Sequence, residues 1–168
     1  MRKVVKMNFN ELKNKEGEID LEGIKKIMPY DKPFLMIDKA IELSNNKITA
    51  VKYFSGEEDF FKGHFVGFPI MAGAITIEGL GQTSTLLVRN NIQNHYEKDI
   101  LAYKLKEVKF IAPIIPPEEV RFEVELIAQD ERVAILQGKA FVNDRLVAEA
   151  LLMLAIVNRA EFRAKYSK

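Results

Sequence analysis

Two ionisable side chains stand alone in a long uncharged stretch of the sequence, and their types could do chemistry. From Gly63 to Val88 the sequence reads GHFVGFPIMAGAITIEGLGQTSTLLV, and its only ionisable side chains are His64 and Glu78. Imidazole exchanges a proton near neutral pH. Burial in an apolar segment raises the pKa of a carboxyl group, so Glu78 could act as an acid. A base and an acid together match β-elimination, which removes one proton and protonates a departing hydroxide.

Each of these residues also has an ordinary structural explanation. A lone histidine in a loop is more often structural than catalytic, and a buried glutamate can simply hydrogen-bond to strand ends. No third ligand stands near the pair, and His95, in the polar segment NNIQNHYEKD, is expected at the surface. The glycines 79 and 81 lack the third glycine of a dinucleotide motif, and no phosphate-binding Gly-Lys-Ser/Thr occurs. The sequence therefore predicts no metal site and no cofactor.

The composition describes one soluble domain. A chain of 168 residues can build one complete core, and 48% hydrophobic with 29% charged residues is typical of a globular protein. The net charge of +1 gives no field that would attract nucleic acid or an anionic membrane, and no apolar segment is long enough to span one. The absence of cysteine excludes disulfides and thiolate nucleophiles. Because MRKVVKMNFNELKNK lacks the continuous apolar core of a secretory signal, we expect a cytoplasmic protein.

The two ionisable residues must be positioned by a loop and a helix. His64 lies in a loop rich in glycine and proline, which permit tight turns. Residues 73–88 are apolar or small, contain no proline and are too long for an ordinary strand, so they predict a helix that carries Glu78. Glycine inside a helix costs about 1 kcal/mol relative to alanine. We therefore expect Gly79 and Gly81 to allow a sheet to wrap closely around this helix.

The remaining elements read as an α+β fold. Asp20 caps a short amphipathic helix that Pro29 stops. The segments FLMIDKAIELS and KITAVKYF predict a β-hairpin, and VRFEVELIA, RVAILQGKAFV and RLVAEALLMLAIV predict an antiparallel meander. Strands do not alternate with helices, which disfavours a parallel sheet. We expect a loose N-terminal extension over residues 1–19, a single domain over 20–158 and a basic C-terminal tail over 159–168.

Three segments resemble the FabZ-type 3-hydroxyacyl-acyl carrier protein dehydratases: MPYDKPFLMID, GHFVGFPIMAGAITIEGLGQ and VKFIAPIIPPEEVRFEVEL. The most specific element is Gly-His-Phe-x-Gly-x-Pro-Ile, followed at a fixed distance by a helix that carries Glu and then Gln, here Glu78 and Gln82. The likeness spans roughly residues 20 to 157. It implies the hot-dog fold, an antiparallel β-sheet wrapped around one long central helix.

The resemblance also implies roles for named residues. His64 would take the proton next to the thioester carbonyl, and Glu78 would protonate the departing hydroxyl. The backbone N–H of Gly73 at the start of the helix would stabilise the developing enolate. Residues implied to bind substrate are Gln82 and the tunnel candidates Phe34, Phe65, Phe68, Ile70 and Met71. Members of the family act as dimers or trimers of dimers in which the histidine and the glutamate come from different subunits.

The implied partner is acyl carrier protein, which is acidic. A basic rim would steer it, and Lys104, Lys106 and Lys109 are candidates. In the absence of such a role, these lysines and the run Arg159, Arg163 and Lys165 are expected to form solvated faces.

The chain departs from the family pattern at several positions. Val66 and Ala72 replace usual prolines, which should loosen the loop that carries His64, and Tyr30 stands where a histidine is common. Two alternative functions therefore remain open. One is a hot-dog thioesterase, in which a helical carboxylate activates water or attacks the thioester. The other is a non-catalytic paralogue that binds acyl carrier protein.

Overall fold

The fold is one antiparallel sheet curved around one helix. The computed structural model describes Val4 and residues 6–167. The strands are β1 (Lys39–Leu43), β2 (Lys47–Phe54), β3 (Lys98–Phe110), β4 (Glu118–Gln129), β5 (Val133–Val142) and β6 (Arg145–Asn158). The helices are α1 (Leu21–Ile27), α2 (Asp59–Gly63), α3 (Gly73–Asn90) and α4 (Arg159–Tyr166), with 3-10 turns at Phe9–Leu12 and His95–Glu97. The strand order is β1-β2-β4-β5-β6-β3, and every neighbouring pair is antiparallel.

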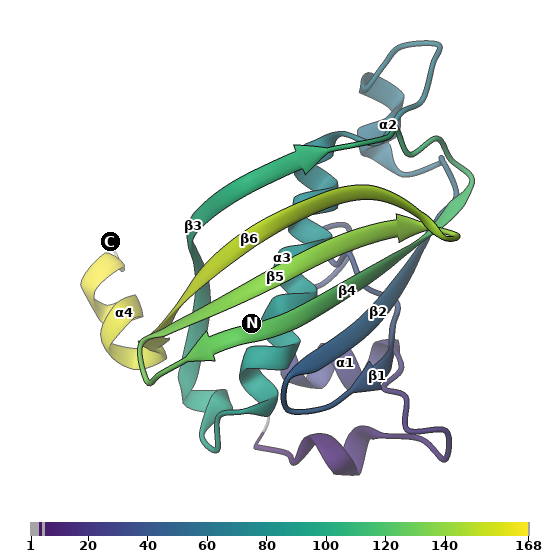
Figure 1. Cartoon of the computed structure of the whole chain (residues 1–168). Helices are drawn as coiled ribbons and strands as arrows, with labels where there is room; N and C mark the ends of the chain where they lie inside the picture. Colours follow the sequence, from purple (N-terminus) through teal and green to yellow (C-terminus); the bar gives the residue numbers. More distant parts are fainter. Residues whose placement is uncertain (1–3, 5, 168) are drawn as a thin grey trace.

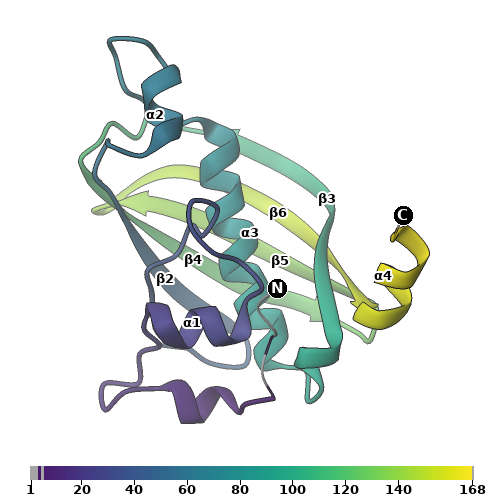
Figure 2. The same cartoon turned by 180° about the vertical axis from the view of Figure 1, so that it is seen from behind.

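Helix α3 lies against the concave face of the sheet, as Figures 1 and 2 show from opposite sides. It begins at Gly73, after the loop that contains Pro69, and most of its residues from Gly79 onwards are buried. Alternate residues of the central strands, such as Phe122 and Leu136, are buried on the same face. The predicted hot-dog fold and the predicted helix are therefore confirmed.

The two glycines of α3 play different parts. A Cβ atom at Gly79 would lie 2.3 Å from Cζ of Phe122 in β4, which is too close for two carbon atoms that are not bonded to each other. The predicted close approach of sheet and helix is thus confirmed at this position. At Gly81 a Cβ atom would meet nothing within 4 Å, so the expectation was wrong there.

The strands largely follow the predicted pattern, with one correction. The β1–β2 hairpin and the β4–β5–β6 meander are present. However, the first strand begins only at Lys39, and residues 34–38 are not a strand. The reason is that backbone groups of Phe34 and Met36 bond to the side chain of Gln82 in α3 instead of a strand ladder.

The chain ends are held more firmly than expected. Phe9 is buried against the body of the domain, and Ile19 forms a bridge with Ala40 of β1, so the described part of residues 1–19 is not loose. At the other end, residues 159–166 form α4, and Arg159 and Arg163 pair with the buried carboxylate of Asp99. The expectation of a solvated basic face was therefore wrong for Arg159, whereas Arg163 is exposed and also pairs with Asp99. Within the described chain, no helix combines the length and apolar character that crossing a bilayer requires.

Replacing Gly79 by alanine should destabilise the fold, because the new methyl group must displace the ring of Phe122. Overpacking of this kind costs about 1–3 kcal/mol. Gly81→Ala in the same helix is the matched control, and it should be neutral or stabilise the protein by up to about 1 kcal/mol. Urea unfolding of both variants provides the measurement. Equal effects of the two substitutions would contradict this account of the packing.

Candidate active site

His64 is held by the loop between α2 and α3. It follows the last residue of α2, and its Nδ1 lies 3.0 Å from the carbonyl oxygen of Ile70. A carbonyl oxygen only accepts, so Nδ1 carries the hydrogen and, in the neutral ring, Nε2 is the basic nitrogen. The ring stacks on Phe65 with centroids 4.3 Å apart. The loop thus orients the imidazole so that Nε2 makes no hydrogen bond to any described residue.

Glu78 lies in the second turn of α3 and is held by Gln82, one turn further along. Gln82 Nε2 donates to Glu78 Oε1 at 2.8 Å and to the carbonyl of Phe34 at 2.8 Å. Gln82 Oε1 accepts from the backbone N–H of Met36 at 2.8 Å. Gln82 is only 1% exposed and its amide is fully occupied. Its place in the structure is therefore to support Glu78, rather than to present a free group to a substrate as the resemblance implied.

The surroundings of Glu78 make it a candidate acid. Partial burial raises the pKa of its carboxyl group above the ordinary value, and the hydrogen bond from Gln82 offsets only part of this rise. Burial raises the pKa of the Tyr30 phenol, and the nearby charge of Glu78 adds to this rise. No described cation pairs with Glu78. The direction of this shift is the one that the sequence predicted for a carboxyl group in an apolar helix.

The start of α3 borders a hollow of about 440 Å³. Its lining includes Gly73, Ile70 and Met71, together with Phe110 of β3. A Cβ atom at Gly73 would lie 2.6 Å from the ring of Phe110, so only glycine allows this contact. The N–H of Gly73 donates to no described residue. The sequence alone does not indicate Phe110 as a site residue, because its contact with Gly73, far away along the chain, leaves no signal in local periodicity.

A second hollow, of about 510 Å³, lies on the other side of α3 and is mainly apolar. Phe34, Phe60 and Ile75 contribute to its lining. Phe34 thus lines a cavity and also carries the carbonyl that holds Gln82. In contrast, Phe65 and Phe68 are 57% and 55% exposed and line neither hollow in the single chain.

His64 and Glu78 share no contact within one chain, and the two hollows near them lie on different sides of α3. The hollow beside the His64 loop contains Gly73 and Thr76, whereas the hollow beside Gln82 contains Ile75, one turn before Glu78. Five positions along a helix correspond to a rotation of about 140°, so Gly73 and Glu78 point in nearly opposite directions. No hydrogen bond or ion pair joins His64 to Glu78 among the described residues. Within one chain neither hollow is lined by both residues.

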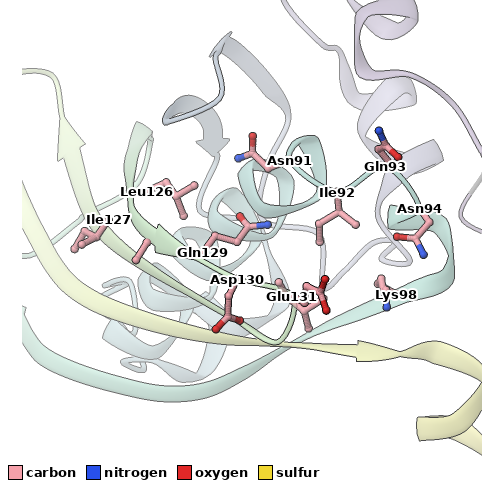
Figure 3. A pocket seen from close by; sticks show the side chains of 12 residues that line it. Asn91, Ile92, Gln93, Asn94, Lys98, Leu126, Ile127, Gln129, Asp130 and Glu131 are labelled. Atoms are coloured by element: carbon pink, nitrogen blue, oxygen red, sulfur yellow. The ribbon is translucent and has the colours of Figure 1, made fainter.

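A larger hollow of about 850 Å³ lies elsewhere and contains neither residue (Figure 3). It lies between the end of α3 and the β4–β5 turn, and its rim carries Asn91, Gln129 and Asp130. Much of this polarity already serves the fold. The carboxylate of Asp130 accepts hydrogen bonds from two backbone N–H groups of its turn. The side-chain amide of Asn91 donates hydrogen bonds to two backbone carbonyls. No group of three His, Cys, Asp or Glu side chains in the described chain is arranged to hold a metal ion.

His95 is not at the surface, which corrects the sequence analysis. It is 3% exposed, its ring contacts Phe9 edge to face, and Nε2 lies 3.0 Å from the carbonyl oxygen of Met7. Its polar neighbours along the chain face outwards while the imidazole faces inwards. Burial lowers the pKa of His95, so the neutral ring is favoured. This histidine attaches the N-terminal segment to the domain.

Comparisons with known proteins agree with this geometry. A family model described as a FabA-like domain matches residues 28–151. The 3-hydroxyacyl-[acyl-carrier-protein] dehydratase FabZ of Koribacter versatilis is 37% identical over 142 residues, which cover 84% of this chain and 91% of that protein. The FabZ of Campylobacter fetus is 35% identical over 84% of this chain and 99% of its own length. The bifunctional enzyme LpxC/FabZ of Porphyromonas gingivalis is 36% identical, and the match covers 88% of this chain and 32% of that enzyme.

Solved structures show the same fold at low sequence identity. The dehydratase heterocomplex ApeI:P from Xenorhabdus doucetiae matches with a TM-score of 0.71 and 15% identity, over 86% of this chain and 97% of that chain. A hypothetical thioesterase with coenzyme A from Streptococcus pneumoniae matches with a TM-score of 0.57 and 9% identity, over 71% of this chain and 84% of that chain.

Replacing Glu78 by glutamine should stabilise the protein at neutral pH. Because the folded state raises the pKa of Glu78, the carboxyl group favours folding below its ordinary value of 4.5, and this contribution is lost as pH rises through the folded pKa. Glutamine carries no charge and keeps the contact with Gln82. Urea unfolding across a pH series should show a gain for Glu78→Gln at pH 7 that shrinks towards pH 4.5. The exposed control Glu131→Gln should show no such trend, and a less stable Glu78→Gln at pH 7 would refute the assignment.

Proposed function

Because the chain belongs to the FabA-like family, with FabZ dehydratases as relatives over most of its length, we propose that it dehydrates 3-hydroxyacyl thioesters carried on acyl carrier protein. The observation that supports this most is the pairing of residue types. A loop-held imidazole with a free basic nitrogen and a helix carboxyl group with a raised pKa supply the base and the acid that β-elimination needs.

The proposed reaction moves two protons. Nε2 of His64 takes the proton from the carbon next to the thioester carbonyl, and the electrons of that C–H bond form the new carbon–carbon double bond. The bond from carbon 3 to its hydroxyl breaks, and the proton of Glu78 goes to the departing oxygen. The products are a trans-2-enoyl thioester and water. A proton then passes from His64 to Glu78, directly or through water, and this restores both groups.

The free N–H of Gly73 would stabilise the charge that develops on the thioester oxygen. It lies at the positive end of the α3 dipole, in the hollow beside the His64 loop. Removing one donor of this kind typically costs about 3 kcal/mol of transition-state stabilisation. The apolar hollow lined by Phe34, together with Phe65 and Phe68 at the loop, is the proposed route of the acyl chain.

A complete site is proposed to need two subunits. Within one chain no described contact joins His64 to Glu78. The outer edge of β3 pairs with no described strand. Beyond Leu101 the side chains of β3 are exposed on both faces, including Tyr103 at 69% and Phe110 at 59%. A long unprotected edge of this kind favours pairing with a second chain. We therefore infer a dimer, alone or within a trimer of dimers, in which His64 of one subunit meets Glu78 of the other.

Acyl carrier protein is the proposed partner, and Lys104 and Lys106 are the proposed contacts. They pair with Met153 and Leu151, which alternate with the buried residues of β6, so both lysines lie on the outer face of the sheet. Both are exposed, and no described residue forms an ion pair with them, whereas Lys109 pairs with Glu149. A cytoplasmic location stays a prediction from the sequence.

Mixing two inactive variants tests the reaction and the shared site together. His64→Ala and Glu78→Gln should each lower kcat by at least about 10²-fold, because each removes one proton-transferring group. When the two chains are co-expressed with different tags, the purified heterodimer should regain up to half of the wild-type activity. One of its two sites then combines His64 of one chain with Glu78 of the other. An inactive heterodimer would show that both residues act within one subunit.

The product identifies the reaction. An enoyl thioester still attached to the carrier supports the dehydratase. Release of free thiol without an enoyl product would establish the thioesterase instead. Binding of carrier without turnover by the wild-type protein would establish the non-catalytic alternative.

Charge reversal tests the carrier contact. The double variant Lys104→Glu with Lys106→Glu should raise KM for the carrier-bound substrate about tenfold and weaken its dependence on salt, because electrostatic steering is lost. KM for a short pantetheine thioester should not change. Lys26→Glu, on the exposed side of α1, is the matched control and should behave as wild type. Equal KM values for wild type and double variant with the carrier would place the contact elsewhere.

A further inference from the structure

The loop that carries His64 exposes apolar side chains that nothing in the single chain covers. Phe65, Val66 and Phe68 are 57%, 87% and 55% exposed. With α2, this loop projects beyond the end of the sheet (Figures 1 and 2). At Val66 and Ala72 the chain lacks the prolines that would fix φ, so the backbone itself restrains the loop less. The loop therefore offers an apolar surface on which a contact from outside the chain could restrain it further.

The C-terminal helix α4 is fixed at the opposite end of the same sheet edge. Asp99, near the start of β3, is 8% exposed and accepts from Arg159 Nε at 2.9 Å and from Arg163 Nε at 2.9 Å. Arg159 Nη2 also donates to the carbonyl of Lys98 at 2.9 Å. A carboxylate shared between two arginines one turn apart fixes the orientation of α4 relative to β3. Figure 1 shows α4 beside the start of β3 and the α2 loop beyond its far end.

Helix α4 also carries an aromatic pair, of which Tyr166 is exposed and Phe162 is half-buried. Phe162 and Tyr166 are one turn apart, and their ring centroids lie 4.9 Å from each other. Tyr166 is 63% exposed, and no residue of α4 is buried. The helix therefore presents an aromatic pair to its surroundings, although its arginines are already used by Asp99.

Two-fold pairing of the free β3 edges would bring these two uncovered surfaces together. In an antiparallel pair of identical strands, the start of one strand lies beside the end of the other. Helix α4 is bound to Asp99 near the start of β3. The end of β3, at Phe110, lies against Gly73, the first residue of α3 after the His64 loop. We propose that α4 of one subunit packs through Phe162 and Tyr166 against Phe65 and Phe68 of the partner subunit and so positions the partner's His64. This inference rests on the dimer of the proposed function.

The contact would make α4 a positioning element for the other subunit's site. Phe65 stacks on the imidazole of His64, so a ring packed against Phe65 restrains the base itself. Aromatic rings packed edge to face or offset attract each other beyond the area that they bury. The contact would also supply the restraint that prolines at positions 66 and 72 would otherwise give.

Disulfide trapping tests the contact directly, because the chain contains no cysteine. Tagged Val66→Cys chains are mixed with untagged Tyr166→Cys chains, allowed to exchange subunits and then mildly oxidised. The expected product is a disulfide-linked pair that contains one chain of each kind. The matched control replaces Tyr166→Cys by Lys26→Cys, an exposed position on α1, and should give no mixed pair. A dimer in solution that gives no mixed product from residues 66 and 166 would overturn the proposal.

The positioning role has its own measurement. Phe162→Ala should lower kcat roughly tenfold while KM for the carrier substrate changes less than twofold, because misplacing a base slows chemistry without weakening binding. Phe162→Leu, which keeps an apolar side chain, should recover most of the loss. An unchanged kcat in Phe162→Ala would overturn the positioning role. If the disulfide forms but the wild-type protein has no dehydratase activity, the proposed function fails and the contact stands, so the two failures are distinguishable.

Discussion

The buried amide of Gln82 is the interaction on which the rest of the site depends. It joins α3 to the backbone at Phe34 and Met36, and it donates to Glu78 on its own helix. Each of these bonds contributes only about 1 kcal/mol net, but an unsatisfied buried donor or acceptor costs about 1–3 kcal/mol. Phe34 and Met36, before β1, form no strand ladder, and the side chain of Gln82 satisfies their backbone carbonyl and N–H instead. Without Gln82, both backbone groups would lose these hydrogen bonds. Fold and site share the same three hydrogen bonds.

Helix α3 contains two ionisable groups that the structure treats in opposite ways. Glu78, near the start, has no cation beside it, and burial raises its pKa. Arg89, in the last turn, is 1% exposed and donates to the carbonyls of His95 and Lys98, while burial lowers its pKa to about 10. Arg89 stays charged at the negative end of the helix, where a cation is favourable. Burial disfavours the charged form of both groups: Arg89 keeps its charge at neutral pH because its pKa stays near 10, whereas the pKa of Glu78 is raised above its ordinary value.

The sequence was informative where a constraint is local. His64 and Glu78 could be singled out because no other ionisable side chain lies between residues 63 and 88. Helix α3 could be placed because residues 73–88 are apolar or small, contain no proline and are too many for an ordinary strand. Gly79 and Gly81 look alike in the sequence, yet only Gly79 faces Phe122. Which face of a helix meets the sheet depends on packing, and the local pattern of small residues does not encode it.

The sequence was misleading where the deciding partner lies far along the chain. The polar neighbours of His95 favoured a surface position, but Met7 and Phe9 cover its ring. Arg159 and Arg163 read as a solvated cluster because their shared partner, Asp99, precedes them by a whole meander of strands. Gln82 was expected to touch substrate because its spacing from Glu78 is that of the family motif. Only the structure shows that its amide is already occupied.

The free edge of β3 links stability to chemistry. The strand shifts register after Ala102 and again after Lys106, and Glu107 at the second shift has a φ of 51°, a conformation that non-glycine residues seldom adopt. On one side the strand forms a long ladder with β6, and beyond Leu101 its side chains, Tyr103 and Phe110 among them, are exposed. The outer edge pairs with no described strand, so the same strand is bound on one side and free on the other. In the proposed dimer, pairing along that edge would cover the exposed side chains and bring His64 of one subunit towards Glu78 of the other, so one contact would serve both stability and chemistry.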